Sequence, residues 1–335
     1  MSVRYNETEY VYISAKVRSL ENLLIGRSTL EKMLSAKDAD EAFSLLRDAG
    51  ADVRSDRRYN ASEREDTLLG LQKQALLDLK AGLPDANLLK IFEYPYDCAN
   101  IKSAIKCEIR GIDCAPLLFD IGSVPSDVAV DAVKRRDFSV FPKNMAKAAA
   151  EAVDEFNRTG NPQAIDFILD RACFADIDDI AKATNADFVL KYCQARADLK
   201  NFIIALRVLR MDCGVYGEKL VGAALVPGGS IDTSDISAAY KRGEDNLFAL
   251  VSDRYGYIGA KISVGCSLEL AEKVCDDCLM DILSSAKMKT YGIEVPFAYV
   301  AAIENEIQNV RMITAGKDAG ADSDILRERL RESYV

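Results

Sequence analysis

The sequence predicts an all-α protein, and three observations support that prediction. Apolar residues recur at spacings of three and four along most of the 335 residues, as they do on one face of an α-helix. Alternating runs with turn dipeptides, which are typical of strands, are hard to find. Capping residues and glycine or proline stops border the periodic segments. We therefore expect helices joined by short turns.

The first two helices are predicted from their apolar faces and end signals. One covers 6–25, where an apolar residue recurs every three or four positions. The next begins at Ser62, which we expect to cap an acidic first turn, and it ends at Gly82 before Pro84.

The later helices carry equally local signals. Pro142 starts a helix rich in good helix formers that stops at Gly160. Asn161 and Pro162 start the next one, which is expected to run to about Ala183. Four further helices complete the chain, over 186–211, 264–289, 296–316 and 323–335.

One short pattern occurs three times within the predicted helices. It consists of an acid, two other residues and an asparagine, and the three asparagines lie 101 and 108 residues apart. Residues three apart share a helical face, so the two polar side chains of each pair can hydrogen-bond. The pairs are Asp97/Asn100, Asp198/Asn201 and Glu306/Asn309.

A second pattern has nearly the same period. A glycine is followed by a serine and a short capped helix at Gly26, Gly122 and Gly229, which lie 96 and 107 residues apart. Solenoid repeats have periods of about 20–50 residues, so each unit here is expected to be a small helical domain. Three similar domains in one chain can close around a pseudo-threefold axis and leave a central opening. The expected domains are 1–113, 114–217 and 218–335.

Two interpretations of the acid–asparagine pairs stay open at this point. Asparagine is a poor residue in mid-helix because its amide competes for backbone hydrogen bonds, so its recurrence indicates a common role. The pairs either pin a helix crossing or a domain joint through locally satisfied amides, or form a polar rim that faces a partner.

The charge balance excludes some partners. Asp and Glu number 53 against 43 Lys and Arg, a net charge of −10, which argues against a nucleic-acid surface and against direct docking on anionic lipid. No run of about 18 uncharged apolar residues appears, and the opening stretch shows no secretory leader. We therefore expect a cytosolic protein, or one held at a membrane through a partner.

The absence of histidine excludes several kinds of chemistry. A Ser-His-Asp triad, a Cys-His pair and a His-ligated zinc site are impossible. No G-x-x-x-x-G-K-[ST] stretch is present to cradle a nucleotide, and we expect no cofactor and no metal. The nine cysteines lie mostly in apolar helical stretches and are expected to be reduced core residues.

Alternatives to a non-catalytic protein rest on a few acids and thiols. Cys275 and Cys278 form a C-x-x-C pair, but they lie inside a predicted helix with acids between them, which should raise a thiol pKa. The acids at 176–179 and 276–277 would suit a metal or general acid–base site, although caps and exposed helix faces are commoner roles. A helical scaffold for unrelated partners is the remaining alternative.

The end of the chain carries a family resemblance. Its last residues resemble the C-terminal signature of the central-stalk subunit of V-type and A-type ATPases. This component is called C in archaeal and bacterial enzymes and d in eukaryotic ones. The matching features are the start of a helix at Gly292–Pro296, the helical stretch "ENEIQNVR" at 304–311, the stop at Gly316 and the closing "ILRERLRESYV". The opening "YVYISAKVRSLENLLIGRSTLEKMLSAKDADEAFSLL" and the stretch "YDCANIKSAIK" are also similar to that family.

The resemblance implies a structural role in a rotary complex. Members are all-helical funnels of three similar domains that sit on the cytoplasmic face of the proteolipid rotor ring and receive the foot of the central shaft. They transmit torque between ATP chemistry and H⁺ or Na⁺ transport, and they bind no nucleotide. A basic residue lies near each asparagine, so our candidates for contact with the shaft are Lys102, Arg207 and Arg311.

Overall fold

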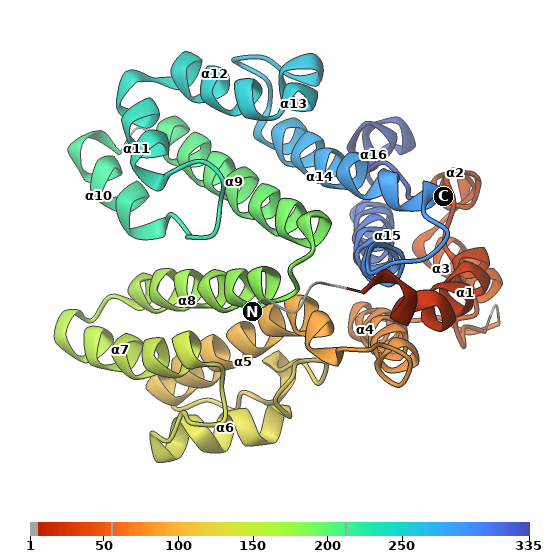
Figure 1. Ribbon diagram of the computed structural model, residues 1–335, viewed down its shortest axis with the longest axis horizontal. Coiled ribbons are helices and arrows are strands. Elements are labelled where there is room, and N and C mark those ends of the chain that lie inside the picture. Colours follow the sequence, from red (N-terminus) through yellow and green to blue (C-terminus); the bar gives the residue numbers. More distant parts are fainter. Residues whose placement is uncertain (1–5, 55, 212) are drawn as a thin grey trace. The chain divides into compact units, whose positions relative to one another are not determined.

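The computed structural model describes residues 6–54, 56–211 and 213–335, and over these ranges it contains helices and no strand (Figure 1). The all-α prediction is confirmed. The chain forms two compact units: a middle unit, Asn87–Leu268, and a terminal unit made of Asn6–Ala86 and Glu269–Val335. Within the described ranges, no helix has the length and apolar character needed to cross a membrane.

The middle unit is built around two long helices that carry the first two acid–asparagine pairs. α5 packs against α6 and α8, and α9 packs against α8, α10, α11 and α12. Phe202 of α9 meets Phe248 of α12 edge to face, with ring centroids 5.1 Å apart. The helices are α5 (Lys90–Arg110), α6 (Ser126–Arg135), α7 (Lys143–Thr159), α8 (Pro162–Ala183), α9 (Asp187–Arg210), α10 (Gly214–Ala224), α11 (Thr233–Arg242), α12 (Glu244–Arg254) and α13 (Gly256–Lys261), with the short 3-10 helix η5 (Ala115–Leu117).

The terminal unit combines both ends of the chain. From the N-terminal part come η1 (Glu7–Tyr10), α1 (Val11–Leu20), η2 (Glu21–Leu23), α2 (Arg27–Ser35), α3 (Ala39–Ser44), η3 (Leu45–Ala49), α4 (Ala61–Lys80) and η4 (Ala86–Leu89), whose last residues enter the middle unit. From the C-terminal part come α14 (Leu268–Ser284), whose first residue belongs to the middle unit, η6 (Ser285–Met288), α15 (Glu294–Asp318) and α16 (Ser323–Arg329).

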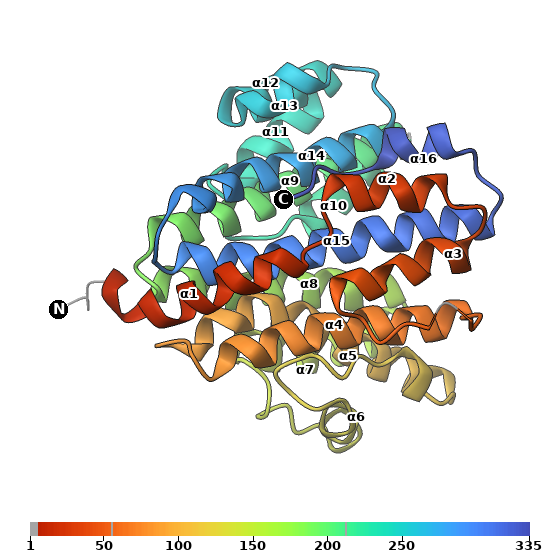
Figure 2. The ribbon, with the colours of Figure 1, turned by 90° about the vertical axis from the view of Figure 1, so that its right-hand side faces the viewer.

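The core of the terminal unit forms around α15, which lies among α1, α2, α3 and α4 (Figures 1 and 2). From Glu294 to Ala302 every residue of this helix is buried, so its apolar residues surround it and do not form a stripe. Leu30 and Phe43 of the N-terminal part share one apolar cluster with Val310 and Leu326 of the C-terminal part. The two ends of the chain therefore fold as one body.

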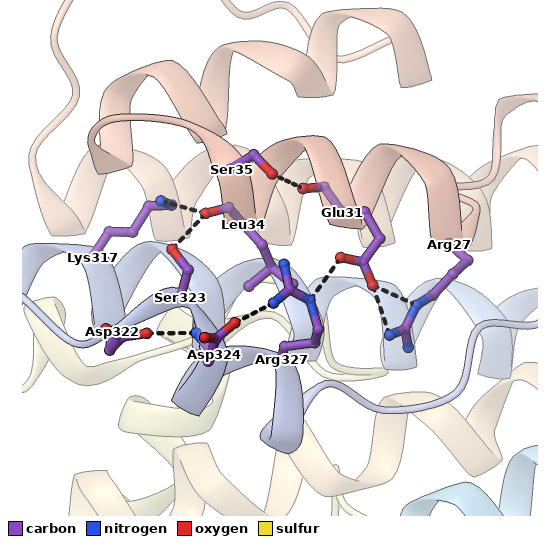
Figure 3. A network of polar contacts seen from close by, with 9 residues as sticks. All are labelled: Arg27, Glu31, Leu34, Ser35, Lys317, Asp322, Ser323, Asp324 and Arg327. Atoms are coloured by element: carbon purple, nitrogen blue, oxygen red, sulfur yellow. Dashed lines mark hydrogen bonds and ion pairs between the residues drawn. The ribbon is translucent and has the colours of Figure 1, made fainter.

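A polar network reinforces the same joint (Figure 3). The carboxylate of Glu31 on α2 accepts from Arg27 at 2.7 Å and from Arg327 on α16 at 3.0 Å. The hydrogen bond from Arg327 holds the pKa of Glu31 below its usual value. The carbonyl of Leu34, near the end of α2, accepts from Lys317 and Ser323, each at 2.9 Å.

Several helix ends match the prediction and others do not. The helix expected over 323–335 ends at Arg329, and the one expected over 264–289 is an α-helix only from Leu268 to Ser284. Gly160 ends α7 in the left-handed conformation, and the side chain of Asn161 caps α8 as expected. The expected Ser62 cap is wrong, because Asn60 forms a reciprocal capping box with Glu63 and starts α4 earlier. The expected stop at Gly316 is also wrong, since α15 continues to Asp318.

Gly316 instead has a packing role. A Cβ atom there would lie 2.3 Å from the Leu326 side chain, so the absence of a side chain allows α16 to approach α15. The division into three domains at 1–113, 114–217 and 218–335 stays a prediction.

Candidate functional site

The first acid–asparagine pair, on α5, holds the loop at 119–124. The Asn100 amide donates to the carbonyl of Phe119 and accepts from its backbone N–H, both at 2.8 Å. The Asp97 carboxylate accepts from the Ser123 hydroxyl at 2.5 Å and from the Val124 N–H at 3.0 Å. Burial raises the pKa of Asp97, and the hydrogen bond from Ser123 opposes the shift.

The second pair, on α9, repeats this geometry. The Asn201 amide exchanges two hydrogen bonds of 2.8 Å with the backbone of Val226. The Asp198 carboxylate accepts from the Ser230 N–H at 2.9 Å, from its hydroxyl at 2.7 Å and from the Ile231 N–H at 3.1 Å. The Tyr255 hydroxyl adds a fourth bond to Asp198 at 2.7 Å. We call each set of acid, asparagine and held loop a clamp.

The third clamp, on α15, is less complete. The Asn309 amide exchanges hydrogen bonds of 3.3 and 2.9 Å with the backbone of Arg331, near the C-terminus. The Glu306 carboxylate accepts from the backbone N–H of Ile25, and its Oε1 has no hydrogen-bond partner in the described part of the chain. Burial raises the pKa of Glu306 to about 8, which favours the protonated carboxyl at neutral pH.

The glycines noted in the sequence belong to the same clamps. A Cβ atom at Gly122 would lie 2.2 Å from Asp97 Oδ1, and one at Gly229 would lie 2.0 Å from Asp198 Oδ1. A Cβ atom at Gly26 would meet Val335 at an ordinary 3.7 Å. Glycine is therefore required by the close approach of the loop to the carboxylate at the first two positions only.

The clamps fix loops to long helices inside their own folded units. All six signature side chains are buried, with the acids 0–4% exposed and the asparagines fully enclosed. Each asparagine satisfies both the N–H and the carbonyl of one loop residue, of which Val226 is buried and Phe119 and Arg331 are half-buried. Backbone groups shielded from water need such partners. This geometry is what an internal pin requires, and it offers no polar rim to a partner.

The three candidate basic residues have different surroundings. Lys102 lies 2.7 Å from Asp170 of α8 and is 18% exposed at its side chain. Arg311 donates to Glu65 of α4 at 2.7 Å. Arg207 lies on the exposed face of α9. Lys102 and Arg311 are therefore each paired with a carboxylate of their own unit.

The alternative sites have structural partners. Cys275 and Cys278 are buried within α14, and burial raises the pKa of Cys278 to about 12, which disfavours the reactive thiolate. Asp176 accepts from the backbone N–H groups of Asn144 and Met145 at the start of α7, so it caps that helix. Asp276 is paired with Arg331 at 2.6 Å.

The residues described include no group of three Cys, Asp or Glu side chains placed to hold a metal ion. The acids at 176–179 and 276–277 act as helix caps and ion-pair partners in this structure.

Sequence reasoning missed the backbone partners of the third clamp, although a signal for them was present. Gly122 and Gly229 each follow an acid–asparagine pair, whereas Gly26 precedes all of them and Glu306 has no such glycine after it. If the unmatched glycine is assigned to the unmatched acid, the segment at Ile25–Gly26 is predicted to contact Glu306. The structure shows this contact in the terminal unit.

Known proteins are similar to this sequence, one of them along nearly its full length. Residues 13–329 match the family described as ATP synthase (C/AC39) subunit. The chain is 23% identical over 335 residues to the C subunit of the V-type sodium ATPase of Enterococcus hirae, covering 97% of this chain and 99% of that protein. It is 27% identical over 197 residues to the C subunit of the A-type ATP synthase of Haloferax volcanii, covering 54% of this chain and 53% of the relative.

Proposed function

Because the chain belongs to the ATP synthase (C/AC39) subunit family, we propose that it is a non-catalytic central-stalk subunit of a V/A-type rotary ATPase. It sits on the cytoplasmic side of the proteolipid rotor ring, receives the foot of the central shaft, and transmits torque between ATP chemistry and H⁺ or Na⁺ transport. It is held at the membrane through these partners, and it binds neither nucleotide nor nucleic acid.

The match to the Enterococcus hirae protein along almost the whole of both chains is the observation that carries this proposal. The alignment covers 97% of this chain and 99% of the relative, so it spans nearly every helix described above. The chemistry of the chain is consistent with this role, because it contains no histidine for acid–base catalysis and no phosphate-binding loop.

The clamps suit a part that must transmit torque. Force passes through a protein without loss only when its loops and helices keep their positions under load. Close-packed helices provide such rigidity, and paired hydrogen bonds from each asparagine fix the loops between them. We propose that the clamps hold the partner-binding surfaces in fixed positions during rotation.

Affinity purification from gently solubilised membranes tests the proposal. We expect the tagged protein to retain the ATPase head, the shaft and the proteolipid subunits in stoichiometric amounts, as identified by mass spectrometry. Recovery of the protein alone, or with unrelated soluble proteins, would favour the helical scaffold instead.

Charge reversal at the three basic residues tests their proposed contact with the shaft. We expect Arg207→Glu, on the exposed face of α9, to reduce co-purification of the shaft subunits by about tenfold, as the loss of about 1.4 kcal/mol at an interface would. Lys102 and Arg311 should be reversed together with their partners, as Lys102→Glu/Asp170→Lys and Arg311→Glu/Glu65→Arg, so that these two ion pairs survive. Asp170 also lies 3.8 Å from Lys200, so Asp170→Lys alone serves as the control for the loss of that second pair.

The matched control is Lys147→Glu, an exposed reversal on α7. Shaft recovery that is equal in Arg207→Glu, in both swapped pairs and in the control would exclude these residues from the shaft contact.

A further inference from the structure

A cavity of about 140 Å³ opens beside the third clamp, entirely within the terminal unit. Its rim is exposed, with Leu23 at 48% and Gln74 also accessible, so solvent reaches the mouth. Its floor is buried and mostly apolar, and it includes Ile25, Leu68 and Ala75. Its volume is close to that of an apolar cavity of about 150 Å³, which admits a molecule the size of benzene.

Glu306 places one polar group in this apolar floor. The residue is 4% exposed and lines the cavity, and its Oε1 has no hydrogen-bond partner in the described part of the chain. The corresponding carboxylates of the first two clamps accept hydrogen bonds on both oxygens, from serine and backbone donors. A buried polar atom without a partner costs roughly 1–3 kcal/mol, which an occupant with a complementary group would recover.

We propose that this cavity binds a small uncharged molecule, a single ring or short branched chain with one hydroxyl group, which exchanges a hydrogen bond with Glu306. The volume limits the occupant to about one ring, and the apolar floor selects against charge. A neutral carboxyl can donate and accept, so a hydroxyl satisfies it in either direction. The proposal does not rest on the role of the chain in a rotary complex.

Binding of p-cresol and toluene to the full-length protein tests the site. The two molecules have similar shapes, but toluene lacks the hydroxyl. We expect saturation-transfer NMR and calorimetry to show p-cresol bound at least about tenfold more tightly than toluene at neutral pH, since one recovered hydrogen bond to a buried group is worth that much. Equal affinities for p-cresol and toluene would show that no hydrogen bond forms between the hydroxyl and Glu306, and would contradict the proposal.

Variants locate the binding within the protein. Glu306→Leu should abolish the preference for p-cresol, whereas Glu306→Gln, which keeps a donor and an acceptor, should retain it. Ala75→Leu fills the floor and Leu23→Trp narrows the exposed mouth, and each should weaken both probes by at least about tenfold. One change is at a buried residue and the other at an exposed one, so misfolding of one variant leaves the other as a test. If p-cresol does not bind, or binds both folded variants as it binds the natural chain, the site does not exist.

Discussion

Replacing Gly229 by alanine is expected to destabilise the middle unit by about 3 kcal/mol. The added Cβ would lie 2.0 Å from Asp198 Oδ1, so either the loop or the carboxylate must move. Movement breaks some of the bonds that Asp198 accepts from Ser230, Ile231 and Tyr255. A buried carboxylate that loses its donors costs roughly 1–3 kcal/mol for each unmade interaction, and overpacking adds to this. Denaturant unfolding, with hydrogen exchange of the α9 amides, measures the loss.

The N-terminal glycine supplies the control. Gly26→Ala should cost less than about 1 kcal/mol, because its Cβ would meet Val335 at 3.7 Å and the change affects only a helix N-cap. Asp198→Ala combined with Gly229→Ala should be less destabilising than the two single effects summed, since removing the carboxylate also removes the clash. Equal costs for the two glycine replacements, or strict additivity, would contradict the clamp as the reason for Gly229.

The sequence reveals local features of this fold more readily than distant ones. The start of α8 is encoded by Asn161 and Pro162, which act on the next few backbone groups, and the prediction there is confirmed. The start of α4 lies before the expected Ser62, because Asn60 forms a reciprocal capping box with Glu63. The preference of a single residue for the cap position does not reveal such a paired interaction.

Gly316 shows why some local signals mislead. A glycine near the end of an apolar pattern usually marks a helix stop. Here the helix continues to Asp318, and the glycine instead leaves space for the Leu326 side chain. The reason lies in tertiary packing, which a helix-end rule cannot contain.

The clamps were visible in the sequence as spacing but not as geometry. The recurrence of Asp97/Asn100 indicated a shared role, yet its partners at Phe119 and Ser123 depend on how the loop returns to the helix. The third clamp was harder to predict, because Glu306 meets Ile25 from the opposite end of the chain. The cavity beside it results from that meeting, so no linear pattern predicts it.

Glu306 is also expected to make the stability of the terminal unit depend on pH. Burial raises its pKa in the folded chain to about 8, against 4.5 for an unperturbed glutamate. Between these two values the folded state holds a proton that the unfolded chain releases, so stability falls as pH rises. The stabilisation is complete below about pH 4.5 and is lost as pH passes through about 8. At 1.36 kcal/mol per pKa unit, the loss is on the order of 3–5 kcal/mol.

The described residues that line the cavity with Glu306 bring no positive charge to offset its ionisation. The titratable groups among them are Asp78 of α4 and Tyr299 of α15, and both are neutral or negative at any pH. The buried Tyr299 has its own pKa raised to about 12 by burial and by the nearby acids. No lining residue therefore offsets the loss of stability that the terminal unit is expected to show when Glu306 ionises.

Glu306→Gln isolates this contribution, because glutamine keeps the size and hydrogen-bonding capacity of the protonated acid but does not ionise. The variant and the natural protein should be similarly stable near pH 5. At pH 9 the variant should be the more stable, by about the 3–5 kcal/mol expected from the shifted pKa of Glu306. Thermal unfolding of both proteins at a series of pH values gives the difference curve. Glu328→Gln, an exposed change on α16, should leave that curve flat. A Glu306→Gln curve that is equally flat would mean that the carboxyl of the third clamp is charged in the folded chain, and that the cavity is more polar than its lining indicates.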